Sequence, residues 1–215
     1  MGICDVFPDV DAAGQHCVSV YARPLPPAFS LIVGDCVNCL RSSLDHVATQ
    51  IVSEITQKTG RFHFPMHEAR DNLVDMTQKS PIKEAFPNIE NIILNTINPC
   101  KAGNETLWLT GKLSNIDKHR QIIVTAGVTS VHIERIFDDN HNQILNSTVE
   151  VKNGTGNSPF GNYLPFKIDG KITPTVSILF GPVENLIDRP VLPLLVEMLQ
   201  RTGNAINAIE TEYLR

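Results

Sequence analysis

The sequence predicts an α+β fold in which long helices pack on an antiparallel β meander and a C-terminal helix closes the domain. Two patterns predict this class. Apolar residues recur every three to four positions up to about residue 121 and again after residue 189, which is the period of amphipathic helices. Between about residues 122 and 182 the period falls to two, as in strands that bury one face. Helices segregated from antiparallel strands define the α+β class.

We expect one domain over residues 1–215. Apolar residues make up 42% of the chain and charged residues 19%, a globular composition that supports a buried core. No linker-like stretch, repeat or low-complexity segment divides the chain. The domain would consist of a helical part over about 28–121, a meander over about 122–182 and a helix over about 189–214.

The first elements are a strand and a long helix. Residues 16–22 alternate weakly between apolar and polar positions, which predicts a strand. A helix is predicted from Ala28 to Thr59, and Gly60 follows its last turn, where glycine is common. Its apolar residues recur at helical spacing: Val33, Val37, Leu40, Leu44, Val47, Ile51 and Ile55.

Several shorter helices follow. One is predicted over residues 68–78, and Pro81 and Pro87 each open another. Asn104 is expected to cap a helix that ends near residue 120.

The meander and the closing helix complete the chain. Residues 121–139 predict one strand or a bent pair, 144–153 predict a strand, and turns are expected at 138–142 and 153–157. Within residues 166–180, Asp169-Gly170 predicts a hairpin turn between two strands. The last helix is predicted from Arg189 to Leu214.

Composition limits the classes of partner and location. The net charge of −5 argues against non-specific duplex binding, which requires a basic surface, although a local basic patch stays open. The five cysteines are odd in number and irregularly spaced, which argues against a disulfide framework. Cys36 and Cys39 form a CxxC without a second pair, which favours small buried side chains over a metal or redox site.

The sequence also predicts a cytoplasmic protein without a membrane partner. The N-terminal residues contain no basic region and no apolar run, so they do not form a signal peptide. No stretch approaches 18 consecutive apolar residues, the length that a membrane-spanning helix requires.

A first polar cluster interrupts the long helix at Arg41, Asp45 and His46. Arg41 and Asp45 are four residues apart on one flank of the apolar stripe, with Asn38 beside them. If buried, such a pair would be costly to break. His46 projects roughly 140° away from Arg41, so the two side chains would meet one phosphate only through a second subunit or a helix irregularity.

A second polar cluster lies where the helix before the sheet ends. It contains Asp117, Lys118, His119 and Arg120. Cations in a last turn suit the negative end of the helix dipole. Alternatively, Asp117, His119 or Arg120 meets Arg41 and Asp45 across a helix pair and forms a charged pocket. His63 and His67 are expected to be loop residues rather than ligands.

Three stretches carry a family resemblance: GDCVNCLRSSLDHVA, FHFPMHEARD and LSNIDKHRQI. They resemble a widespread family of uncharacterised bacterial proteins with an LR(S/A)xLDHxA helix, an FP loop and an LxxIDKHR segment at similar separations. The resemblance covers about residues 28–125 and implies no activity. RSSLDH also resembles the R-x4–6-H motif of HEPN-type ribonucleases, which implies RNA cleavage.

The leading functional hypothesis is a non-catalytic binding or interaction protein that uses no cofactor. Its partner would be a small molecule or a protein. Its structural polar network, which would also flank a pocket, would comprise Asn38, Arg41, Asp45, Asp117, Lys118 and Arg120.

Two alternatives involve chemistry. In the first, a HEPN-like endoribonuclease works without metal as a homodimer, with His46 or His119 as acid or base and Arg41 stabilising the phosphorane charge. In the second, Asp45, His46, Asp117 and His119 hold a metal ion, although the chain has no HExxH motif to support that set.

Overall fold

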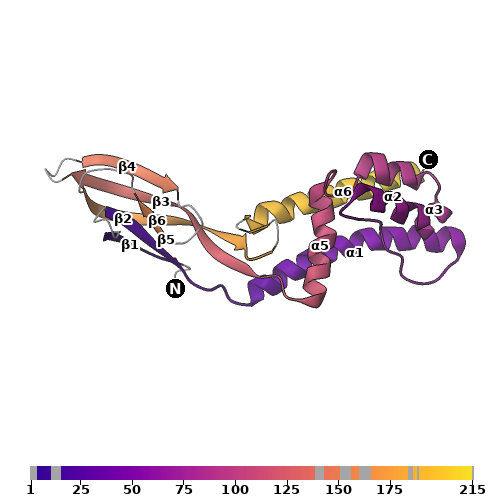
Figure 1. Cartoon of the computed structure of the whole chain (residues 1–215), viewed down its shortest axis with the longest axis horizontal. Coiled ribbons are helices and arrows are strands. Elements are labelled where there is room, and N and C mark those ends of the chain that lie inside the picture. The colour runs from indigo at the N-terminus through magenta and orange to yellow at the C-terminus, as the bar shows by residue number, and fades with distance from the viewer. Residues whose placement is uncertain are drawn as a thin grey trace. The chain divides into compact units, whose positions relative to one another are not determined.

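Figure 1 shows the computed structural model of the chain, which describes residues 4–10, 16–138, 143–150, 156–159, 166–183, 186–187 and 189–214. The chain divides into two compact units. The strand unit comprises Met1–Phe29 and Ile123–Val191, and the helical unit comprises Ser30–Ile122 and Leu192–Arg215. This separation of antiparallel strands from helices, with a helix at the C-terminal end, confirms the predicted α+β class. That residues 1–215 form a single domain stays a prediction.

The strand unit contains two three-stranded antiparallel sheets, with strand orders β1-β2-β5 and β4-β3-β6. The strands are β1 Cys4–Val10, β2 His16–Ala22, β3 Val124–Asp138, β4 Gln143–Glu150, β5 Gly156–Pro159 and β6 Phe166–Phe180. The predicted strand over residues 16–22 is confirmed. The sequence pattern missed β1, which contains Pro8; the proline is tolerated because β1 lies at the edge of its sheet.

The predicted hairpin turn at Asp169-Gly170 is wrong, because β6 is one continuous strand. It pairs with β3 from Val124↔Phe180 to Asp138↔Phe166. The register shifts between Ile133↔Ile172 and Arg135↔Asp169, so two residues of β6 face one residue of β3. The glycine therefore serves a β-bulge, and the long partner strand supplies the pairing that a hairpin turn would have ended.

The other turn predictions fall largely outside the described residues. Residues 139–142 and 151–155 are not described, so the turns expected there stay predictions. The turn expected over 153–157 is too long, because β5 already begins at Gly156 and pairs with β2. β4 confirms the strand predicted over 144–153 up to Glu150, and the last three predicted residues lie outside the described residues.

The helical unit is built from α1 Ala28–Thr56, α2 Arg70–Lys79, α3 Pro81–Ala85, α4 Ile89–Asn91, the π-helix η1 Ile92–Ile97, α5 Glu105–His119 and α6 Val191–Tyr213. The Asn104 side chain accepts a hydrogen bond from the Leu107 amide, which confirms the predicted cap of α5. α1 ends three residues earlier than predicted, because Gln57 adopts a left-handed conformation with φ of 58°.

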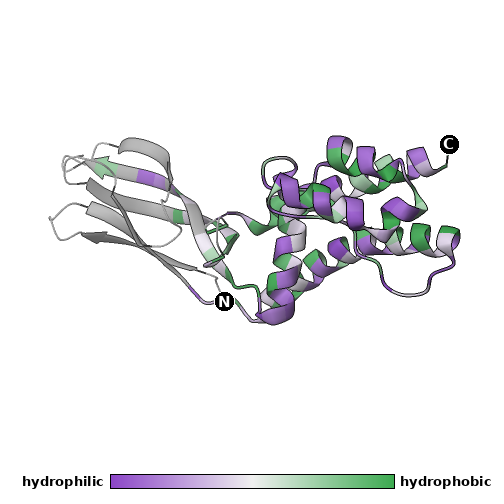
Figure 2. Cartoon of the chain, turned by 45° about the vertical axis from the view of Figure 1, so that its right-hand side comes forward, coloured by the Kyte–Doolittle hydropathy of each residue, from purple (hydrophilic) through white to green (hydrophobic). Residues whose placement is uncertain are grey.

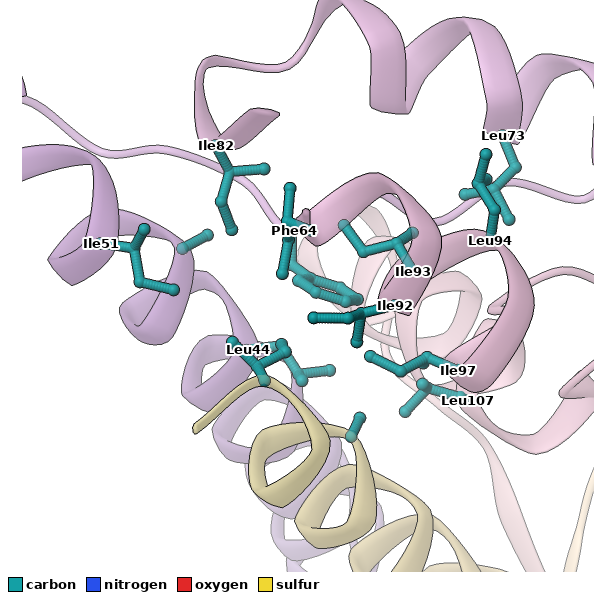
Figure 3. Close-up of a cluster of buried hydrophobic side chains, with 14 of the residues drawn as sticks. Leu44, Ile51, Phe64, Leu73, Ile82, Ile92, Ile93, Leu94, Ile97 and Leu107 are labelled. Carbon is teal, nitrogen blue, oxygen red and sulfur yellow. The ribbon is translucent and has the colours of Figure 1, made fainter. Parts of the chain in front are cut away.

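One buried cluster holds these helices together. Leu44 and Ile51 of α1, Phe64 of the following loop, and Ala205 and Ile209 of α6 belong to it, as does much of η1. Figure 3 shows Phe64 among the isoleucines of η1, with Leu44 and Ile51 beside it. The first and the last helix of the chain thus contribute to the same core.

The helices are amphipathic, with some apolar residues left outside the core. Figure 2 shows hydrophobic and hydrophilic residues alternating around the helices of the helical unit. Of the residues predicted on the apolar face of α1, Leu40 is only half-buried and Ile55 is 47% exposed. In the part of the chain that the structure describes, no helix is long and apolar enough to cross a membrane.

Candidate functional site

A groove of about 1350 Å³ lies within the helical unit. Its walls come from the Arg41–Asp45 turn of α1, the loop over residues 61–68, the end of α2, and one side of α5 with the residue after it. The loop wall is formed by FHFPMHE, which the sequence pattern could identify only as an irregular segment. Loops held against a rigid helical scaffold are common places for binding sites.

The groove is cationic although the chain is acidic. Its lining includes six arginine and lysine residues against three carboxylates, an excess of three positive charges in a chain of net charge −5. The cations are Arg41, Arg61, Lys79, Lys112, Lys118 and Arg120, and the carboxylates are Asp45, Glu68 and Asp75. Three imidazoles, those of His63, His67 and His119, also line the groove. The groove is therefore a local basic patch, which the net negative charge of the whole chain does not reveal.

Arg41 and Asp45 anchor the loop wall to α1. Their side chains are 14% and 13% exposed, and Arg41 Nη2 lies 2.8 Å from Asp45 Oδ1. Arg41 donates a hydrogen bond to the Phe64 carbonyl at 2.9 Å, and the Phe64 amide donates to Asp45 Oδ1 at 2.9 Å. Both backbone polar groups of Phe64 are thus satisfied while its ring enters the core at 1% exposure. The Arg41–Asp45 pair therefore attaches the loop around Phe64 to α1, and within the described residues it does not join α1 to a second helix.

Burial of Arg41 and its pairing with Asp45 have opposite effects on the pKa of Arg41. Burial lowers the pKa of Arg41, and the negative charge of Asp45 with its hydrogen bond partly restores it. A guanidinium remains charged in proteins, so the buried cation depends on its carboxylate partner.

Asp45 also orients a histidine. Its second oxygen, Oδ2, lies 3.0 Å from His63 Nδ1. The other contacts of Asp45 are with donors, so the imidazole nitrogen facing it carries the proton and Nε2 is left with a free lone pair. The His63 side chain is 66% exposed. The sequence pattern missed this contact because 18 residues separate the partners and no helical or strand period connects them.

The other two histidines of the groove have different environments. The Ala69 amide donates to His67 Nδ1 at 3.2 Å, which places the proton of a neutral imidazole on Nε2. His119 is the last residue of α5 and is exposed. The groove therefore presents a hydrogen-bond acceptor, Nε2 of His63, and a hydrogen-bond donor, the Nε2–H group of His67.

A separate polar contact joins α1 to α5. Asn38 Nδ2 donates to Asp117 Oδ2 at 2.8 Å, and the Ser114 hydroxyl donates to Asn38 Oδ1 at 2.7 Å. The Asp117 carboxylate occupies the space that a β-carbon on Gly34 would need, so glycine permits the close approach of the two helices. Asn38 and Asp117 do not line the groove.

The predicted polar network is thus divided between two separate sites, the Asn38–Asp117 contact and the groove that contains Arg41 and Asp45. Within the described residues, no hydrogen bond or ion pair joins the Asn38–Asp117 contact to the Arg41–Asp45 pair. Lys118, His119 and Arg120 share the groove with Arg41 and Asp45 without touching them through a hydrogen bond.

His46 does not belong to this groove. It is exposed on α1, so the structure brings together Arg41 and His119 of the predicted catalytic set but not His46. Over the described ranges, no group of three or more His, Cys, Asp or Glu side chains is placed to hold a metal ion. The four predicted ligands Asp45, His46, Asp117 and His119 are not assembled. Cys36 and Cys39 are exposed, which corrects the expectation that they fill the core.

Comparison of the chain with protein-family models, with curated proteins and with solved structures found no significant match. Functional inference therefore depends on the groove itself.

Proposed function

We propose that the protein is a binding protein whose cationic groove takes an anionic, phosphate-bearing ligand. One observation carries this proposal. Arg61, Lys118 and Arg120 line the groove, and among the described residues none of the three side chains has an oppositely charged partner. Uncompensated cations gathered in a concave site attract anions and raise their local concentration.

The carboxylates of the groove do not cancel these cations, because each is already paired. Asp45 pairs with Arg41, and Asp75 pairs with Lys79 at 2.6 Å. Glu68 pairs with Lys101 at 3.2 Å. The net positive charge is therefore concentrated on Arg61 and at the C-terminal end of α5, where Lys118 and Arg120 lie.

Phosphate is the anion that suits these groups best. Guanidinium groups present several N–H donors in a planar fork that matches phosphate oxygens, and lysine adds a point charge. Lys112 contributes in a different way, because its ammonium lies 5.1 Å from the centre of the Trp108 ring. Binding requires no reaction, in keeping with the sequence-based hypothesis of a non-catalytic protein.

Calorimetric titration with tripolyphosphate tests the proposal. We expect saturable binding by the wild type and at least a tenfold loss of affinity in the double variant Lys118→Gln/Arg120→Gln, since each lost charge-assisted hydrogen bond is worth about 1.5–3 kcal/mol. Lys58→Gln is the matched control, because Lys58 is exposed, pairs with Glu84 and lies outside the groove. No binding by the wild type, or equal loss in the control, would reject the proposal.

The HEPN-like alternative based on His46 has less support. Its catalytic histidine lies outside the groove, and a second subunit would have to bring it to a phosphate. The metal-site alternative lacks assembled ligands among the described residues.

A further inference from the structure

We propose that the ligand is RNA and that the groove cleaves it by transesterification, with His63 as general base, His119 as general acid and Asp45 as the residue that positions His63. This inference rests on the proposed anion-binding function and adds a reaction to it. It assigns the reaction to a loop histidine rather than to the His46 of the helical motif.

The first support is the geometry of the Asp45–His63 pair. The nearly buried carboxylate accepts the Nδ1 proton at 3.0 Å, which fixes the tautomer and the orientation of the ring. The same carboxylate is held in place by Arg41 and by the Phe64 amide. Nε2 is then a neutral acceptor on a mostly exposed ring at the groove wall, as a general base requires.

The second support is the absence of an activated hydroxyl or thiol. Among the described residues that line the groove, Ser80 is the one hydroxyl, and no cysteine, threonine or tyrosine is present. The Ser80 hydroxyl oxygen caps α3 by accepting from the Ile82 amide. A base beside cations, without a hydroxyl or thiol nucleophile, suits a substrate that carries its own. RNA does so, because a 2′-hydroxyl adjoins each phosphate.

The proposed step balances without any further reactant. His63 Nε2 takes the 2′-hydroxyl proton, and the 2′-oxygen forms a bond to phosphorus. The bond from phosphorus to the 5′-oxygen breaks, and the leaving oxygen takes a proton from the His119 imidazolium. The products are a 2′,3′-cyclic phosphate and a 5′-hydroxyl, and exchange with water restores both histidines. Lys118 and Arg120, which line the same groove, would stabilise the charge on the phosphoryl oxygens.

The experiment incubates the full chain with end-labelled single-stranded RNA in EDTA, beside DNA of the same sequence and 2′-O-methyl RNA. We expect RNA fragments that end in a 2′,3′-cyclic phosphate and no cleavage of the other two strands. His63→Ala and His119→Ala should each reduce the cleavage rate by about 100-fold or more, the usual contribution of a positioned acid or base. Both side chains are exposed, so circular dichroism of the variants should match the wild type.

His46→Ala separates this assignment from the one that the helical motif suggests. Cleavage should persist in this variant, because His46 lies outside the groove. Cleavage lost in His46→Ala but retained in His63→Ala would overturn the proposal, and so would wild-type cleavage that all three variants retain.

Asp45 is tested by separating kcat from KM. Asp45→Asn removes the carboxylate that orients His63, so kcat should fall while KM for RNA changes little, because Lys118 and Arg120 still line the groove. A purely structural role would change KM together with kcat, because a displaced loop wall would alter the groove. Both constants are measured at a temperature at which the circular dichroism of Asp45→Asn matches that of the wild type.

The outcomes distinguish the reaction from the binding on which it rests. If tripolyphosphate and 2′-O-methyl RNA bind but RNA stays intact, the cleavage proposal is wrong and the binding function stands. If neither binds, both proposals are wrong.

Discussion

At the scale of single residues, Asp45 connects α1 to the loop wall of the groove. One of its oxygens contacts Arg41 and the Phe64 amide, and the other faces His63. It therefore holds the loop wall in place and sets the tautomer of a histidine. A carboxylate with this many donors, only 13% exposed, becomes costly when any charged partner is removed.

Arg41→Ala is expected to destabilise the protein strongly. The change leaves Asp45 without its cation and the Phe64 carbonyl without its donor, so the free energy of unfolding should fall by about 3–5 kcal/mol. Urea denaturation measures this fall. Arg61→Ala is the control, because Arg61 is exposed and pairs with none of the described residues; it should change stability by less than about 0.5 kcal/mol. Equal stability of Arg41→Ala and the wild type would refute the anchoring role.

At the scale of elements, α1 contacts the rest of the helical unit through two of its sides. One side contributes Leu44 and Ile51 to the shared core. The flank beside it contacts α5 through Asn38 and the loop through Arg41. The groove is the space left between these contacts, so its shape depends on how closely α1 and α5 approach each other.

A pair of glycine substitutions tests that approach. Gly34→Ala places a methyl group where the Asp117 carboxylate lies, and moving Asp117 would break its hydrogen bond with Asn38. Its unfolding free energy should fall by about 1–3 kcal/mol, which outweighs the gain in helix propensity.

Gly203→Ala is the matched control, because Gly203 also lies inside a helix but, apart from its chain neighbours and the backbone of its own helix, no heavy atom lies within 4 Å of the added β-carbon. It should stabilise the protein by about 0.5–1 kcal/mol. Thermal and urea denaturation compare the two, and a shift of the same sign in both variants would contradict the proposed close helix contact.

At the scale of the whole molecule, charge is distributed unevenly. The chain carries a net charge of −5, yet the groove lining carries an excess of three positive charges. Under the proposed function, the groove is where such a protein would accept an anionic ligand despite its net negative charge. Affinity for phosphate-bearing ligands should therefore reflect short-range contacts in the groove rather than general attraction.

Ionic strength tests this distribution. The screening length shrinks from about 10 Å at 0.1 M salt to about 3 Å at 1 M. Affinity for tripolyphosphate should fall as sodium chloride rises over this range, because the exposed cations of the groove are screened. Titration calorimetry at several salt concentrations measures the slope. An affinity independent of salt would show that Lys118 and Arg120 do not carry the binding.

What the sequence by itself determined is mainly local. The alternation of residues 16–22 predicts β2, and Asn104 predicts the start of α5, because both signals act within a few residues. The Asp169-Gly170 prediction failed because the same dipeptide serves a turn or a bulge. The partner strand β3, distant in sequence, decides between them.

The helical spacing of Arg41 and Asp45 identified an ion pair, and only the tertiary structure shows what that pair does. It binds the backbone of Phe64 and orients His63 across 18 residues of intervening chain. The cationic groove likewise combines a helix, a loop and a helix end whose charges are scattered along an acidic sequence. Periodicity reports which face a residue occupies on its own element. Which residue it meets on another element depends on how loops close and how the core packs, and neither has a local period.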